Sequence, residues 1–373
     1  MAARIESAAA LRLAALILLT CCFAPAQSSP SPAHARSGAA RPRNAYVGAQ
    51  ECAGCHPGEA ASQATTPMAH ALSPASASAI LRGHSPMILR NGPYAYKVSL
   101  EGNAATFAVS AGGRGIAVPI LWAFGYGTGE VGQTYVFRYG GFYYESQVSY
   151  YSALSGLGIT IGHIAYPPAS LGLALGYPLQ PESVRRCFAC HATNAVSGGK
   201  FQPDKMIPGV SCEACHGPGA RHVASMKSGD AVNLHISNPG RLSTAGITAF
   251  CGSCHRTAAD ERALKIRGPE NDRFQGYRIT LSRCYSPTDS RISCTSCHNP
   301  HEPLVTEPGA YDAKCEACHS RTAAAGPHGA RACPVATRDC VTCHMPKVEV
   351  PGAHFRFTDH FIRIARANEP YPG

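Results

Sequence analysis

Seven copies of one five-residue pattern, Cys-x-x-Cys-His, constrain this chain more than any other feature of its sequence. They contain 14 of its 18 cysteines. The cysteine pairs are Cys52 and Cys55, Cys187 and Cys190, Cys212 and Cys215, Cys251 and Cys254, Cys294 and Cys297, Cys315 and Cys318, and Cys340 and Cys343. The histidines that follow them are His56, His191, His216, His255, His298, His319 and His344.

This pattern is the attachment signature of c-type haem. Each thiol adds to one haem vinyl group, and the adjacent histidine ligates the iron. We therefore expect seven covalently attached haems. Two alternatives explain the pattern less well, because a zinc site takes four protein ligands in varied paired spacings and a redox dithiol needs no histidine after its second cysteine.

The N-terminal residues have the pattern of a secretory signal peptide. Arg4 and Arg12 precede a short apolar run at residues 13–24, and the small-residue sequence Ala24-Pro25-Ala26 follows at its end. We expect cleavage after Ala26 and export to the periplasm, in agreement with haem attachment outside the bacterial cytoplasm. Lipid anchoring through Cys21 or Cys22 is an alternative, but the threonine before them suits a lipid-attachment site poorly.

The rest of the chain divides by composition. The expected parts are a disordered Ser/Pro/Ala/Arg-rich tether at 27–45, a first haem segment at 46–84, a β-rich insert at 85–180 and a six-haem domain at 181–373. From residue 181 onward short apolar pieces alternate with Gly and Pro. We expect a multihaem cytochrome c fold, in which short helices and irregular loops surround a stack of haems that replaces the usual core.

Two stretches of the insert predict hairpins. Residues 94–110 alternate apolar and polar side chains around Gly102-Asn103, and residues 133–151 do so around Gly140-Gly141. We expect a small sheet that covers one face of the haem array. A docking or substrate-access role for this sheet is the alternative.

The formal net charge of +10 does not predict nucleic-acid binding. Each haem brings two propionates, whereas a ferric porphyrin core carries one positive charge, so seven ferric haems shift the balance by roughly −7. The chain also lacks a basic block with interleaved aromatic residues. We expect redox proteins as partners, and no nucleic acid.

Ten histidines lie outside the motifs, and enough of them are available to serve as sixth iron ligands. The candidates are His70, His163, His222, His301, His328, His354 and His360, with His84 and His235 as weaker ones. This number favours low-spin haems with two histidine ligands at most sites.

Chain length indicates that some of these ligands serve another haem. His301 follows His298 by three residues, which reach about 10 Å and cannot close around a porphyrin edge. His222 follows His216 by six residues, which reach at most about 20 Å when fully extended. We expect both histidines to bind the iron of a different motif.

Cys284 and Cys333 are the cysteines left after the motifs and the signal peptide. An unpaired thiol is a liability in an exported chain. We expect a disulfide between them.

Several segments resemble the bacterial periplasmic multihaem cytochromes c, the superfamily that includes hydroxylamine oxidoreductase and its tetrahaem electron acceptor. They include CFACHAT, GVSCEACHGPGARH, SCTSCHNPHEP and HFRFTDHFIRI, and the resemblance covers about residues 46–80 and 181–364. In this superfamily the second histidines of CHGPGxxH and CHxPH commonly ligate other haems. The resemblance implies this role for His222 and His301, and suggests it for His360.

Two departures bear on activity. Relatives that reduce nitrite to ammonia carry lysine in place of one motif histidine, whereas all seven motifs here end in histidine. Hydroxylamine oxidoreductase uses a tyrosine cross-linked to its catalytic haem, and none of the 16 tyrosines is identified as its counterpart. We therefore expect an electron carrier. The alternative is an oxidoreductase for a small nitrogen or sulfur oxyanion with one open haem, for which the isolated first haem is the main candidate.

Overall fold

The computed structural model describes residues 44–126, 131–230, 232–319, 332–366, 369 and 371–372. The expected signal peptide, most of the tether and His328 lie outside these ranges. Within them, no helix has the length and apolar character needed to cross a membrane.

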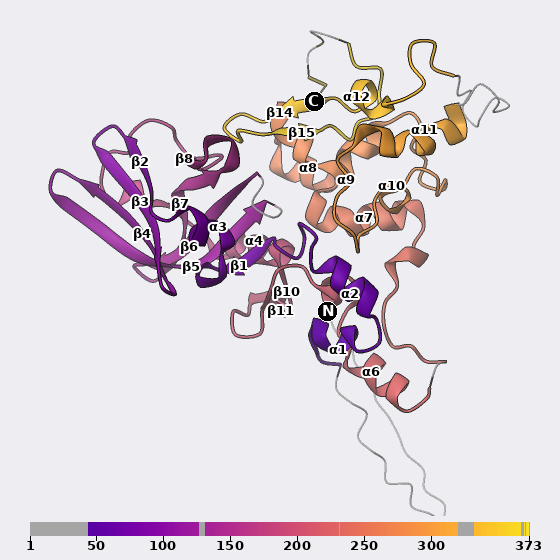
Figure 1. Cartoon of the computed structure of the whole chain (residues 1–373), viewed down its shortest axis with the longest axis horizontal. Coiled ribbons are helices and arrows are strands. Elements are labelled where there is room, and N and C mark those ends of the chain that lie inside the picture. Colours follow the sequence, from indigo (N-terminus) through magenta and orange to yellow (C-terminus); the bar gives the residue numbers. More distant parts are fainter. Residues whose placement is uncertain are drawn as a thin grey trace, which may run out of the picture. The chain divides into compact units, whose positions relative to one another are not determined.

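One antiparallel sheet forms between residues 72 and 178 (Figure 1). Nine described strands belong to it: β1 (Leu72–Pro74), β2 (Met87–Asn91), β3 (Tyr94–Glu101), β4 (Ala104–Ala111), β5 (Arg114–Tyr126), β6 (Gly132–Tyr139), β7 (Phe142–Tyr151), β8 (Gly156–Ile159) and β9 (Gly176–Pro178). Strands β2 to β8 are neighbours in chain order, β1 pairs with β5, and β9 pairs with β7. The end strands β2 and β8 contact each other, so the sheet curls around its own core.

Both hairpins predicted from the sequence are confirmed. Strands β3 and β4 pair with Val98 opposite Phe107, and both side chains are fully buried. Strands β6 and β7 are joined at Gly140 and Gly141, whose φ angles are 55° and 87°. Two successive positive φ angles are typical of the tight turn that matches the twist of a hairpin, and glycine adopts them without a steric penalty.

The sheet extends beyond the predicted β-rich insert. Residues 72–84, assigned from the sequence to the first haem segment, supply β1 and helix α3 (Ala79–His84). Ile80 and Leu81 of α3 are buried in the hydrophobic core of the sheet. Burial of these apolar side chains explains why the segment joins the sheet.

Short helices dominate outside the sheet. Besides α3, they are α1 (Ala49–Ala53), α2 (Pro57–Gln63), α4 (Pro181–His191), α5 (Cys212–His216), α6 (Ala220–Lys227), α7 (Thr244–His255), α8 (Ala258–Leu264), α9 (Gln275–Arg278), α10 (Cys294–Cys297), α11 (Asp312–His319) and α12 (Cys340–His344). Three two-stranded pairs complete the regular structure: β10 (Ala192–Thr193) with β13 (Ile207–Pro208), β11 (Val196–Ser197) with β12 (Lys200–Phe201), and β14 (Lys347–Glu349) with β15 (Arg356–Thr358). The expected short helices at the motifs are thus present.

Few apolar side chains are buried after the sheet. Among the described residues from 196 onward, the buried hydrophobic ones are Ile247, Phe274, Val350 and Ala353. The sheet, by contrast, has a core cluster of 20 buried residues. Four buried side chains form too small a core for a stretch of this length.

Helix α4 attaches the second motif to the sheet. The Phe188 ring lies 4.9 Å from Trp122 and 5.0 Å from Phe124, both on β5, in edge-to-face geometry. Leu72, Val136 and Val184 complete this second apolar cluster. The motif at the end of α4 therefore lies beside the sheet.

Candidate haem-binding centres

Every attachment motif forms a helical turn. Helices α4, α5, α7, α11 and α12 each contain a whole motif. At α10 the histidine follows the helix, and at α1 both Cys55 and the histidine follow it. The histidine N–H still donates to the first cysteine carbonyl, at 2.8 Å for His56 and 3.0 Å for His298. Residues i, i+3 and i+4 of a helix lie on one face, so the two thiols and the imidazole of each motif are presented together.

Within the described ranges, three pairs of a motif histidine and a second histidine are seen, and the second histidine comes from a segment that follows a different motif. The pairs, with the distance between ring centroids, are His56 with His222 (6.5 Å), His216 with His301 (6.0 Å) and His298 with His360 (6.2 Å). A metal–imidazole bond of about 2.0–2.1 Å puts two imidazoles on opposite sides of one ion with centroids roughly 6.3 Å apart. Each pair therefore has the separation that one shared iron requires.

Backbone carbonyls fix the ring nitrogens of five histidines. In each, Nδ1–H donates to a carbonyl oxygen: His191 to Ala71 (3.0 Å), His216 to Ser237 (2.8 Å), His222 to Leu234 (2.7 Å), His344 to Arg363 (2.9 Å) and His360 to Thr358 (2.9 Å). This arrangement sets the tautomer and leaves Nε2 as the free nitrogen. It is the arrangement that iron ligation needs.

Burial keeps several of these rings neutral. Desolvation, together with the neighbouring His298, lowers the pKa of His360 to about 4. Burial also lowers the pKa of His191 and of His298. Neutral imidazole is the form that binds a metal ion. Covalently attached haem thus fits the cysteine pairs, the paired histidine rings, their free Nε2 atoms and the small number of buried apolar side chains.

His163 does not fit its predicted role as an iron ligand. Its Nδ1 bonds to Gln147 Oε1 at 3.1 Å, and its Nε2 bonds to Glu145 Oε2 at 3.2 Å. The ring also stacks on Tyr177 with centroids 4.1 Å apart. Because both nitrogens are used within the sheet, the prediction for His163 conflicts with the structure.

Two other predicted ligands, His70 and His354, are not paired with a motif histidine within the described residues. His70 is exposed, one residue before the Ala71 carbonyl that holds His191. His354 is exposed, and its ring lies edge-on to Tyr151 at 4.8 Å. His328 lies outside the described residues.

The predicted disulfide between Cys284 and Cys333 is wrong, because both are free thiols. Cys284 is half-buried, and burial together with the Cys318 and Cys297 thiols raises its pKa. Cys333 is exposed and accepts hydrogen bonds from the N–H groups of Ala336 and Val335, which lower its pKa. The two cysteines thus have different neighbours.

Two carboxylates that were not predicted from the sequence join motifs to other segments. Glu213, inside the α5 motif, is 2% exposed and accepts hydrogen bonds from the N–H groups of Val47, Gly48 and Gly219 at 2.8–2.9 Å. Asp312, at the start of α11, accepts the N–H of Cys340 at 2.9 Å. Neither residue has a sequence signal, since Glu316 occupies the position of Glu213 in a second CEACH and is exposed.

A cavity of about 230 Å³ lies at the second motif. Cys187 and His191 line it together with Phe124, Glu145 and Thr160 of the sheet region, and with Arg273. Among the described residues, no histidine ring is paired with His191 as in the three pairs above, although the motif histidine His255 interacts with it electrostatically. The first motif, which the sequence suggested as the unusual one, instead has His222 beside its histidine.

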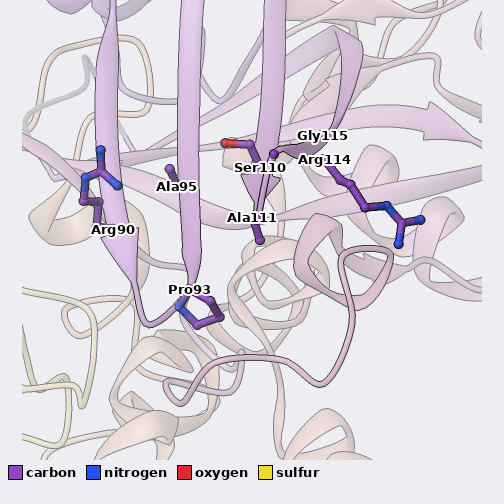
Figure 2. Close-up of a pocket in the computed structure, with 9 residues that line it drawn as sticks. Arg90, Pro93, Ala95, Ser110, Ala111, Arg114 and Gly115 are labelled. Atoms are coloured by element: carbon purple, nitrogen blue, oxygen red, sulfur yellow. The ribbon is translucent and has the colours of Figure 1, made fainter.

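A second hollow, of about 400 Å³, lies on the sheet away from every motif. Figure 2 shows Arg90 and Arg114 at its sides, on different strands. Its lining contains neither cysteine nor histidine. It therefore offers no haem ligand.

Comparisons with known proteins point to one class. A protein-family model described as cytochrome c554 and c-prime matches residues 175–217, which contain the motifs of α4 and α5. The multiheme cytochrome MtrA of Shewanella baltica (strain OS185) is 23% identical over 192 residues, which cover 45% of this chain and 54% of that protein. The chain thus spans about half the length of this curated relative.

Among solved structures, the outer cell wall cytochrome OcwA aligns with 85% of this chain and 79% of its own, at 15% identity and a TM-score of 0.49. This chain carries seven attachment motifs, and it is similar in sequence to MtrA and, over residues 175–217, to the cytochrome c554 family. The chain is thus similar to multihaem c-type cytochromes.

Proposed function

We propose that this protein transfers electrons in the periplasm as a cytochrome with seven c-type haems, most of them low-spin with two histidine ligands. The observation that carries the proposal is the set of three histidine pairs, whose ring centroids lie 6.0–6.5 Å apart. Two strong-field nitrogen ligands give six-coordinate, low-spin haem, which suits electron transfer. Each pair joins segments that follow different motifs, so ligation also holds the array together.

The chain supplies ligands, orientation and exclusion of water. Haem, when bound, takes up and releases single electrons. The paired histidines keep Nε2 free toward iron, and for His216, His222 and His360 the bond from Nδ1 to a carbonyl fixes the ring. Such bonds raise the basicity of the ligand and help to set the reduction potential.

Export and partners belong to the same proposal. The N-terminal signal pattern supports a periplasmic location, where redox proteins of the periplasm or the membrane are the expected donors and acceptors. MtrA, the curated relative, is a multiheme cytochrome by name, which supports electron transfer as the class of activity.

Mass spectrometry and low-temperature EPR of the fully oxidised protein test this proposal. We expect a mass increment of seven haems and predominantly low-spin ferric signals. A mass without haem would refute the assignment. A spectrum dominated by high-spin iron would refute two-histidine ligation as the main state.

One observation favours a second candidate, an oxidoreductase with one open haem. The cavity at His191 brings Glu145, Thr160 and Arg273 to the second motif. A cation and a carboxylate beside an open iron could bind a small oxyanion and move protons. A high-spin ferric signal that is lost in His191→Ala and responds to nitrite or hydroxylamine would favour this function, and a spectrum unchanged by both compounds would exclude it.

A further inference from the structure

The three histidine pairs differ in the angle between their ring planes. At the third and first motifs, the planes of the paired rings lie at 9° and 20°. At the fifth motif, the planes of His298 and His360 are turned against each other by 41°. The fifth motif therefore has the most strongly turned of the three pairs.

The angle between two axial imidazoles affects the electronic state of the iron between them. Each ring donates π electrons to the iron d orbital that overlaps with its own π system. Parallel rings raise the energy of the same orbital, which stabilises low-spin ferric iron because that orbital lacks one electron. Turned rings act on two orbitals and bring their energies together, so the largest EPR g value increases and the reduction potential rises.

The His360 ring is fixed to its own stretch of chain. Its Nδ1–H donates to the carbonyl of Thr358, two residues earlier, at 2.9 Å. The rings of His216 and His222, by contrast, donate to carbonyls 21 and 12 residues away. The plane of the His360 ring therefore follows the orientation of residues 358–362, which we call the ligand segment.

A buried ion pair holds the ligand segment in place. Asp359, directly before His360, accepts hydrogen bonds from Arg278 Nε and Nη2 of α9 at 2.9 and 2.7 Å. Both side chains are fully buried. The same carboxylate accepts the N–H of Phe361 at 2.9 Å. Because two parallel bonds fix the direction of the carboxylate, the backbone on either side of His360 is fixed as well.

Ser282 holds the ligand segment at a second point. It is 4% exposed and lies four residues after Arg278, directly after the 3₁₀ turn Ile279–Leu281. Its Oγ accepts the N–H of Ile362 at 2.8 Å and donates to the carbonyl of His360 at 3.4 Å. We call Arg278, Asp359 and Ser282 the clamp.

We propose that the clamp holds the His360 ring turned against His298, and that it thereby gives the haem of the fifth motif a g value and a reduction potential of its own. The inference rests on the proposed electron-transfer function, in which both histidines bind one iron. The clamp residues are positioning residues, since they act through the orientation of the ring. Release of the clamp lets the ring turn toward the parallel arrangement that ferric iron favours.

Ser282→Ala in the full-length holoprotein tests the clamp. It removes one contact point and keeps the buried ion pair. EPR of oxidised His360→Ala first identifies the haem, as the low-spin signal that this variant loses. In Ser282→Ala we expect the same signal to stay low-spin, with its largest g value lowered. We also expect its reduction potential to fall in an EPR-monitored redox titration.

Ser146→Ala is the matched control. The Ser146 Oγ is also buried, donates to the carbonyl of Val148 at 2.8 Å and accepts the N–H of Tyr135 at 3.2 Å, but it lies within the sheet. Its removal should leave the spectrum and the potentials unchanged. A wild-type g value and potential in Ser282→Ala would overturn the proposal, as would an equal shift in Ser146→Ala.

Arg278→Lys provides the same test if Ser282→Ala does not fold. Lysine keeps the positive charge but has no planar fork for two parallel bonds to Asp359. The g value and the potential should fall here too, and wild-type values would overturn the proposal. Failure of the proposed function is distinct, since His360→Ala would then lose no low-spin signal, or the wild-type mass would show no haem.

Discussion

Glu213 offers the sharpest test of how the motifs are held together. It occupies the third-motif CEACH sequence, and Glu316 occupies the same position in the sixth. Glu213 is 2% exposed and accepts three backbone N–H groups, whereas Glu316 is exposed. Two of these donors, Val47 and Gly48, precede α1, and the third, Gly219, precedes the helix of His222. One carboxylate thus fixes both segments that carry the first histidine pair.

Replacement of Glu213 by Gln keeps one acceptor oxygen and puts an N–H₂ group where the other stood. The Gly48 N–H donates to Oε2 and the Val47 and Gly219 N–H groups to Oε1, so at least one buried N–H loses its acceptor. Hydrogen bonds to charged groups contribute about 1.5–3 kcal/mol, neutral ones about 1 kcal/mol, and an unsatisfied buried donor costs about 1–3 kcal/mol. We expect the free energy of unfolding to fall by about 2–4 kcal/mol.

Guanidinium denaturation of the holoprotein measures this loss, and EPR reports the first histidine pair. Glu213→Gln should lower the midpoint and alter one low-spin signal. Glu316→Gln is the matched control and should leave the midpoint and the EPR signal unchanged. Substitutions at exposed positions usually change the free energy of unfolding by less than about 0.5 kcal/mol. Equal effects of the two variants would refute the reasoning, as would a wild-type midpoint in Glu213→Gln.

His222→Ala should convert one low-spin EPR signal to high-spin, whereas His163→Gln should leave the spectrum unchanged, because His163 bonds only within the sheet. Arg278→Met should lower the free energy of unfolding by about 3–5 kcal/mol, as measured by denaturation. It removes the buried guanidinium whose Nε and Nη2 donate to Asp359 at 2.9 and 2.7 Å. Burial and Asp359 raise the pKa of Asp272 to about 7. The stability that protonated Asp272 contributes should therefore be lost as pH rises from about 4 to 7. Asp272→Asn should abolish this fall in the free energy of unfolding, measured by denaturation at several pH values.

Local patterns predicted the elements that local rules control. The Cys-x-x-Cys-His spacing predicts three groups on one helical face, and all seven motifs form such a turn. Alternation around Gly140-Gly141 predicts a hairpin, because the turn type and the side-chain period are both set by neighbouring residues. These predictions needed no knowledge of distant segments.

Pairings between distant segments could not be predicted in the same way. Chain reach indicates that His301 does not bind the iron of His298, but it cannot choose among the other motifs. The structure brings His301 to His216, 85 residues earlier in the chain. Identical CEACH sequences also give a buried Glu213 and an exposed Glu316, because only tertiary packing decides burial.

Counting residues, without their surroundings, produced the two errors. His163 was included as a spare histidine, yet a carboxylate and an amide in the sheet occupy both of its nitrogens. Cys284 and Cys333 were paired because they were left over, although their neighbours differ. A residue type alone does not identify its partner.

Removal of haem should show that the sheet keeps its structure without the cofactor, whereas the helical region does not. The sheet has 20 buried residues in its own cluster, so it should fold without the cofactor. The described residues from 196 onward bury four hydrophobic side chains, and two pairs of facing histidines from distant segments lie among them. For the full chain made without haem attachment, we expect hydrogen-exchange protection in β2 to β7 and none in α7 or α11. Protection of α7 comparable to that of β6 would show that the polypeptide alone stabilises the array, and would contradict the view that haem replaces its core.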